Sequence, residues 1–410
     1  MPDTVRSTLG RWLRRHSLTL VATLGGAAGV AYAAAQLAPA PSRPPPAAIA
    51  SSETTPPGEQ ARDTVTDTVQ IALILDTSSS MNGLINQARS HLWKMVDDIG
   101  KMTRTVDGKT RGVKIELALF EYGNDTLSAD GGYIRQVLPL TTDLDKVSEQ
   151  LDGLFTNGGS EYAGQAIQTA VSSLAWSNDP DALRFVFIAG NESFDQGPIP
   201  AAAAMSLAAG KDITVQLIHC GGEEPTWSAA ALLAKSDLMK IDQNKVAAHI
   251  PAPQDAEILR LGGELNSTYV AYGAQGQAAL ARQSKADASS AKLSAKSALE
   301  RSQLKAKKGY KNESWDLVDA VEKDGKFLDK AKDSDLPAEL QGKSIEEKQA
   351  YVRAKTAERA ALKKRIRELE AERQTFLDAE RAKRDPDAPS LESELMKGTK
   401  KAAAKKGYKL

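Results

Sequence analysis

Between residues 69 and 265, short apolar runs alternate with amphipathic segments that have the spacing of a helix. Residues 69–75 form a short, nearly continuous apolar run, which is typical of a β-strand buried on both faces. Strands alternating with amphipathic helices indicate a mainly parallel, doubly wound α/β sheet covered on both faces. Further strands are predicted at 113–122, 134–140, 183–189, 213–219 and 246–250, and helices at 84–99, 142–154, 162–176, 200–209 and 255–265.

The pattern changes after residue 273, where strand-forming residues become rare. Residues 274–308 are rich in Ala, Ser, Lys and Gln and predict one long helix. Residues 344–384 contain no proline or glycine, and Ser344 with Glu347 fits a capping box. The apolar stripe on this second helix gives a partial coiled-coil signal and predicts a helical hairpin between the two helices. The stripe consists of Leu362, Ile366, Leu369 and Phe376, with Lys355, Arg359 and Arg373 in the same seam.

The N-terminal residues have the pattern of an export signal. Arginines in the first sixteen residues precede an uncharged apolar stretch, residues 17–40, that contains small residues suited to cleavage. We therefore expect a signal peptide at 1–36, with a retained membrane anchor through 17–40 as the alternative. Residues 37–66 are rich in proline and alanine and predict a linker. The remaining divisions are an α/β domain at 67–273 and a helical tail at 274–410.

Charge is distributed unevenly along a chain that is neutral overall. Residues 51–280 hold 16 basic and 29 acidic residues, whereas residues 281–410 hold 32 basic and 23 acidic residues. The last basic stretch, 397–409, is interpreted as a solvated, disordered terminus. No nucleic-acid partner is expected for an exported protein. The single cysteine, Cys220, excludes an intramolecular disulfide and a cysteine-cluster zinc site.

Candidate chemistry follows the first predicted strand. Asp76, Ser78 and Ser80 occupy alternate positions directly after the strand and can face one concavity. A second loop, Gly158-Gly159-Ser160-Glu161, precedes a predicted helix and offers the Ser160 hydroxyl. Hydroxyl and carboxylate oxygens suit a hard divalent cation, with Mg²⁺ as the first choice and Mn²⁺ or Ca²⁺ as alternatives.

These motifs, in a strand–helix–strand context, resemble the von Willebrand factor type A domain over residues 68–272. The resemblance implies a metal-ion-dependent adhesion site in which Asp76, Ser78, Ser80 and Ser160 surround the ion. The family's remaining acid normally follows the fourth strand in a Thr-Asp-Gly sequence, whereas this chain has Gly190 at that position. Candidates for a replacement acid are Glu192, which we favour for its reach, Asp195 on the same loop, and Glu161 beside Ser160.

Longer phrases at 190–197, 241–244 and 253–258 resemble exported bacterial proteins that combine this domain with a helical tail. The resemblance implies a metal-dependent protein-binding module for adhesion or assembly, located in the periplasm or outside the cell. Its partner would offer an Asp or Glu carboxylate to the ion. The alternative is a structural scaffold with a vestigial metal site that assembles through its helical tail. No enzyme is expected, because G-x-S-x-G, H-E-x-x-H and P-loop signatures are absent from the sequence.

Overall fold

The computed structural model describes residues 66–242, 244, 249–383 and 391–409. The predicted signal peptide and all but the last residue of the predicted linker lie outside these residues. Among the helices that are described, none combines the length and apolarity that a membrane crossing requires.

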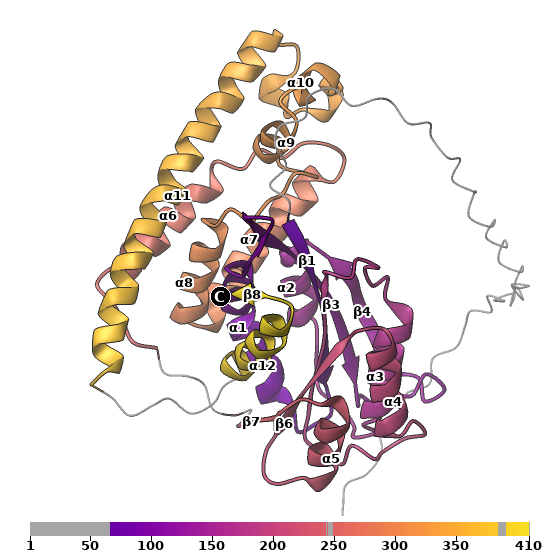
Figure 1. Cartoon of the computed structure of the whole chain (residues 1–410). Helices are drawn as coiled ribbons and strands as arrows, with labels where there is room; N and C mark the ends of the chain where they lie inside the picture. The colour runs from indigo at the N-terminus through magenta and orange to yellow at the C-terminus, as the bar shows by residue number, and fades with distance from the viewer. Residues whose placement is uncertain (1–65, 243, 245–248, 384–390, 410) are drawn as a thin grey trace, which may run out of the picture. The chain divides into compact units, whose positions relative to one another are not determined.

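The described sheet has a mainly parallel core in the order β7-β6-β5-β1-β3, with β4 antiparallel to β3 at the far edge. This order and the covering helices confirm the predicted doubly wound α/β fold (Figure 1). The strands are β1 Thr66–Asp76, β2 Thr103–Val106, β3 Lys109–Tyr122, β4 Ile134–Thr141, β5 Leu183–Gly190, β6 Thr214–Cys220, β7 Leu238–Ile241 and β8 Tyr408–Lys409.

Two apolar cores lie on opposite faces of the sheet because successive side chains of a strand point to opposite sides. In β1, Leu73 belongs to one core and Ile74 to the other. The first core includes the helices within residues 82–152 and most of the helices after residue 255, and the second includes the helices within residues 163–234. The helices that flank the sheet are α1 Asn82–Gly100, α2 Leu144–Asp152, α3 Ala163–Ser173, α4 Ala201–Gly210, α5 Pro225–Ala234 and α6 Asp255–Asn266.

Two features of the sheet differ from the sequence-based prediction. β2 and β3 form an antiparallel hairpin whose turn places Asp107 and Gly108 at positive φ, a conformation that an Asp-Gly pair adopts readily. The last parallel strand is β7, not the predicted strand at 246–250: residues 249 and 250 are not in a strand, and 245–248 lie outside the described residues. β7 escaped prediction because it has only four residues, one of them a lysine.

The predicted long helix at 274–308 is two helices, α7 Gly276–Leu293 and α8 Ala295–Lys305. Ser294 is extended between them, and its side chain caps α8 by accepting a hydrogen bond from the Ser297 amide. The predicted capping box of Ser344 and Glu347 is present at the start of α11. The remaining C-terminal elements are α9 Leu317–Lys323, α10 Phe327–Lys330, α11 Ile345–Arg381 and α12 Leu391–Lys405, with 3₁₀ turns η1 Asp333–Asp335 and η2 Ala338–Leu340.

α11 packs against α8, which is part of the predicted partner segment, and also against α9 and against α6 of the α/β body, so the predicted contact between the two tail segments is present but is not a simple two-helix hairpin. Ile366 and Leu369 are buried in the first core, and Leu362 packs against it. The basic seam residues pair with acids on neighbouring elements: Arg359 with Asp316 and Asp319, and Arg373 with Asp255.

The C-terminal residues correct the prediction of a disordered basic terminus. α12 packs on α1, β6 and β7, and β8 pairs with β2 (Figure 1). Leu391, Leu395 and Ala403 are buried, while Lys397 and Lys401 on the same helix are exposed. The helix is amphipathic, and its lysines form only the outer face.

Candidate functional site

The candidate site lies at the carboxyl end of β1, the central strand of the sheet. Asp76 is the last residue of β1 and is fully buried. The Ser78 amide donates a 2.7 Å hydrogen bond to Asp76 Oδ1, and the hydroxyl oxygens of Ser78 and Ser80 lie 3.3 Å apart. The structure therefore brings Asp76, Ser78 and Ser80 together, as their spacing predicts.

The second predicted loop reaches the same edge of the sheet. The Ser79 amide donates to the Gly158 carbonyl over 3.0 Å. Ser160 forms a bridge with Gly123, which follows β3, and its amide donates to Asp125 Oδ1 over 3.3 Å. These contacts place the Ser160 backbone at the edge where Asp76 lies.

Glu161, rather than Glu192, approaches Asp76. Its side chain is buried and lies close to Asp76, since a Cβ atom added at Gly123 would meet Glu161 Cγ at 2.8 Å and Asp76 Oδ1 at 2.9 Å. Burial, followed by the neighbouring Asp76 charge, raises the pKa of Glu161, and burial also raises the pKa of Asp76. Two adjacent buried carboxyl groups can come together only with a shared proton or a cation between them.

Gly190 occupies the position where the resemblance implies an aspartate, and its surroundings leave no room for one. A Cβ atom at Gly190 would lie 2.1 Å from the Tyr122 hydroxyl and 3.2 Å from Asp76 Oδ2. Tyr122 is buried at the end of β3 and donates to the Ala189 carbonyl over 3.3 Å. The tyrosine therefore takes the space of the missing acid.

The loop after β5 contributes Asn191 to the site. Ser80 Oγ donates to Asn191 Oδ1 over 3.3 Å. The Asn191 carbonyl accepts from His219 Nε2 over 3.1 Å. Glu192 and Asp195 are exposed on this loop. Sequence reasoning missed the amide of Asn191, for which a polar residue after a buried strand was the available signal.

The oxygen atoms of Asp76, Glu161 and the neighbouring hydroxyl and amide side chains suit a hard cation. The described residues contain no cluster of three or more acidic, histidine or cysteine side chains, so neutral oxygens would complete the site. Asp76 Oδ2 is buried and, among the described residues, has no hydrogen-bond donor. Carboxylate, hydroxyl and amide oxygens are the ligand types that Mg²⁺ and Ca²⁺ prefer. The residues present therefore fit a divalent cation with two carboxylates and neutral oxygens around it.

The carboxyl pair predicts a pH dependence of the metal-free protein. An acid whose pKa is raised by folding stabilises the native state below its unfolded pKa of about 4, and that contribution is lost as pH rises through the folded pKa. We expect the melting temperature in EDTA to fall more steeply between pH 5 and pH 8 for the wild type than for Glu161→Gln. Calorimetry at both pH values measures the two slopes, and equal slopes would contradict the pairing of these carboxyl groups.

The contact of Gly190 with Tyr122 predicts a large cost for one added methyl group. Gly190→Ala should lower the free energy of unfolding by about 1–3 kcal/mol, because overpacking forces neighbours to shift. Gly159→Ala is the matched control, since a Cβ there meets no atom within 4 Å. Urea denaturation of both variants provides the comparison. A Gly190→Ala protein as stable as the control would show that Tyr122 does not close the position.

Comparison with protein-family models and with curated proteins finds no match. Among solved structures, the chain is similar to proximal thread matrix protein 1 from the mussel byssus with a zinc-occupied adhesion-site motif, at 14% identity and a TM-score of 0.34, covering 45% of this chain and 44% of that one. It is also similar to the conserved hypothetical protein BatB from Bacteroides thetaiotaomicron, at 16% identity and a TM-score of 0.33, covering 42% of this chain and 90% of that one.

A third similar structure is the type A domain of SpRpn10, at 15% identity and a TM-score of 0.32, covering 45% of this chain and all of that one. The chain spans less than half of the length of the mussel protein. The structures that this chain is similar to thus include von Willebrand factor type A domains, and its own strand order and covering helices form a doubly wound α/β sheet.

Proposed function

We propose that the α/β domain is a cation-dependent protein-binding module, not an enzyme, and that its site is centred on Asp76. The observation that carries the proposal is the buried Asp76 carboxylate, whose Oδ2 has no donor among the described residues and which lies beside the Glu161 side chain at Gly123. A buried anion of this kind requires a compensating charge. Hard-cation binding at oxygen ligands supplies it.

The residues around Asp76 have distinct roles in this proposal. Asp76 provides negative charge, and Ser78 and Ser80 provide neutral hydroxyl oxygens. Asn191 fixes the orientation of the Ser80 hydroxyl through their 3.3 Å contact. Mg²⁺ is the favoured ion, with Mn²⁺ or Ca²⁺ as alternatives. When bound, the ion would supply a positive charge with open coordination positions for a carboxylate of the partner protein.

The surface at this edge supports dependence on the cation. Ser80, Glu192 and Asp195 are exposed, so a partner can reach the rim of the site. Without a cation, the exposed acids and the Asp76–Glu161 pair repel an acidic group.

One observation favours the alternative of a scaffold with a vestigial site. Tyr122 closes the position of the acid that the resemblance implies, which leaves the loop after β5 without a buried carboxylate. In that case the helical tail would be the part of the chain that assembles with partners. The two functions differ in a measurable property, because only the first requires a bound ion with open coordination positions.

Proton relaxation of water around Mn²⁺ tests the proposal directly. For the full-length chain we expect Mn²⁺ addition to enhance water relaxation, and acetate, used as the carboxylate probe, to reduce that enhancement by displacing water. EDTA should remove the effect, and Asp76→Asn should show none. If the wild type and Asp76→Asn behave alike, the site does not hold the ion and the scaffold becomes the preferred function.

We also propose that the protein is exported, which rests on the sequence pattern of residues 1–36. A cleaved signal predicts a mature N-terminus near residue 36, whereas an anchor through 17–40 predicts an intact one in the membrane fraction. N-terminal sequencing of the protein from fractionated cells separates these results. Recovery of the intact chain from the cytoplasm alone would contradict export.

A further inference from the structure

Among the acids that the structure describes as buried, Asp76 and Glu161 differ from the others in having no basic partner within the described residues. Asp145 pairs with Arg301 at 2.7 Å, Asp67 with Arg104 at 2.9 Å, and Asp316 with Arg359 at 2.6 Å. Within the described part of the chain, no lysine, arginine or histidine forms an ion pair with Asp76 or Glu161. Buried carboxylates are normally paired with a base or coordinated to a metal. The described residues therefore supply no positive charge to balance this pair.

The backbone around the pair leaves space for both carboxyl groups. Gly123 has φ +81°, and a Cβ there would lie 2.8 Å from Glu161 Cγ and 2.9 Å from Asp76 Oδ1. Any other residue at this position would push the two side chains apart. The glycine therefore allows a carboxylate from the loop before α3 to meet the carboxylate at the end of β1.

We propose that Glu161 supplies the second carboxylate ligand of the cation, in place of the acid that Gly190 cannot provide. This inference rests on the proposed function, since it concerns the same ion. Glu161 comes from a different loop than the missing acid, the loop before α3, and its side chain lies next to Asp76 and Ser78 around Gly123. Glu192, the acid that sequence reasoning favoured, has an exposed side chain, and its carbonyl accepts from Trp227 Nε1.

A second carboxylate changes how the charge of the bound cation is balanced. Asp76 and Glu161 together carry a charge of −2 when ionised, which balances a divalent cation without help from a partner. A site with Asp76 alone would depend on the partner's carboxylate for charge balance. The ion therefore binds before the partner arrives, and the partner adds to a site that is already loaded.

The experiment measures free Mn²⁺ by electron paramagnetic resonance in solutions of the full-length chain without any carboxylate probe. We expect the wild type to bind Mn²⁺, and Glu161→Gln to bind it more weakly by on the order of 10- to 100-fold, the range seen when groups around a metal are removed. Glu192→Gln is the matched control and should bind within about twofold of the wild type, because an exposed acid interacts weakly with the ion.

Melting temperatures without metal show that the variants are folded. Glu161→Gln should melt at or above the wild-type temperature in EDTA at pH 8, because it removes one of two adjacent like charges. Wild-type affinity in Glu161→Gln would overturn the inference and leave the proposed function intact. Loss of affinity in Glu192→Gln alone would assign the role to Glu192, and no Mn²⁺ binding by the wild type would overturn both proposals.

Discussion

Replacing Arg301 with methionine should lower the free energy of unfolding by about 3–5 kcal/mol, because it leaves buried acids without a cation. Arg301 on α8 is 1% exposed. Its Nη2 lies 2.7 Å from Asp145 Oδ1 on α2, and its Nε lies 2.7 Å from Asp287 Oδ1 on α7. A single side chain therefore joins the C-terminal helices to the α/β body.

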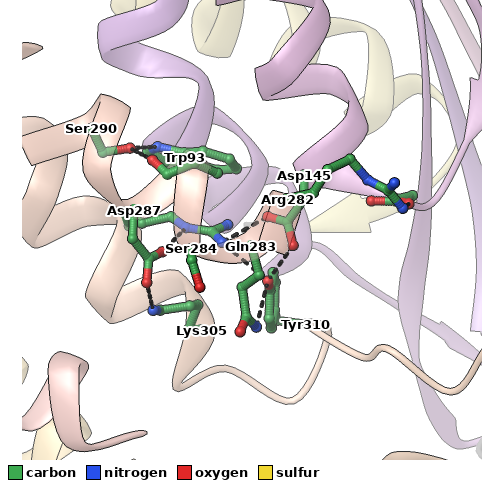
Figure 2. A network of polar contacts seen from close by, with 12 residues as sticks. Trp93, Asp145, Arg282, Gln283, Ser284, Asp287, Ser290, Lys305 and Tyr310 are labelled. Atoms are coloured by element: carbon green, nitrogen blue, oxygen red, sulfur yellow. Dashed lines mark hydrogen bonds and ion pairs between the residues drawn. The ribbon is translucent and has the colours of Figure 1, made fainter. Parts of the chain in front are cut away.

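Arg301 links Asp145 and Asp287, which Figure 2 shows together with Lys305 and Tyr310 in a network of hydrogen bonds and ion pairs. Tyr310 donates a 2.8 Å hydrogen bond to Asp145 Oδ2, and Lys305 lies 2.5 Å from Asp287 Oδ2. The Arg301 guanidinium lies over the Trp93 ring, 4.4 Å from its centroid, which adds a cation–π contact. Methionine fills a similar volume, so the expected loss reports the unpaired acids and not a cavity.

Arg260→Met is the control for the Arg301 measurement. Arg260 is exposed and pairs with Glu257 and Glu264 on its own helix, α6. Exposed ion pairs contribute little, so this variant should unfold close to the wild type. Guanidinium denaturation gives both values. Equal stability of the two variants would show that the buried network does not hold the helices to the body.

Leu395→Ala should lower the free energy of unfolding by about 2–5 kcal/mol, the usual cost of truncating a buried leucine. Leu395 on α12 is 2% exposed and belongs to the first core together with residues of β1 and α1. A core residue this near the C-terminus means that the end of the chain is part of the fold. Deleting its side chain removes contacts that no neighbour can replace.

Lys400→Ala tests whether the loss at Leu395 comes from burial. Lys400 is exposed on the same helix, so its replacement should change stability little and keeps helix propensity high. Urea denaturation followed by circular dichroism compares the two. If Leu395→Ala is as stable as Lys400→Ala, the C-terminus is a solvated tail and the packing of α12 is refuted.

The parts of the fold that depend on local pattern could be predicted from the sequence. The buried strands β1, β5 and β6 correspond to apolar runs that only a doubly covered sheet accommodates. α12 could not be predicted in the same way, because the lysines of its outer face dominate the composition while Leu391 and Leu395 form the inner face. The break at Ser294 depends on a single capping contact.

The site could be predicted as far as spacing along one strand determines it. Asp76, Ser78 and Ser80 come together because they follow one buried strand. The choice among Glu161, Glu192 and Asp195 depends on packing between distant elements. Tyr122 fills the space at Gly190, whereas Gly123 leaves room for the Glu161 side chain beside Asp76. The sequence around the candidate acids does not indicate either effect.

The central claim is that Asp76 lies at the centre of a divalent-cation site. Anomalous scattering from crystals of the full-length protein grown with Mn²⁺ tests it most directly. We expect one anomalous peak at the carboxyl end of β1, within coordination distance of the oxygens of the proposed ligands Asp76, Ser78, Ser80 and Glu161. If crystals grown at a saturating Mn²⁺ concentration show no peak there, or show their only peak at another place on the protein, the claim is contradicted.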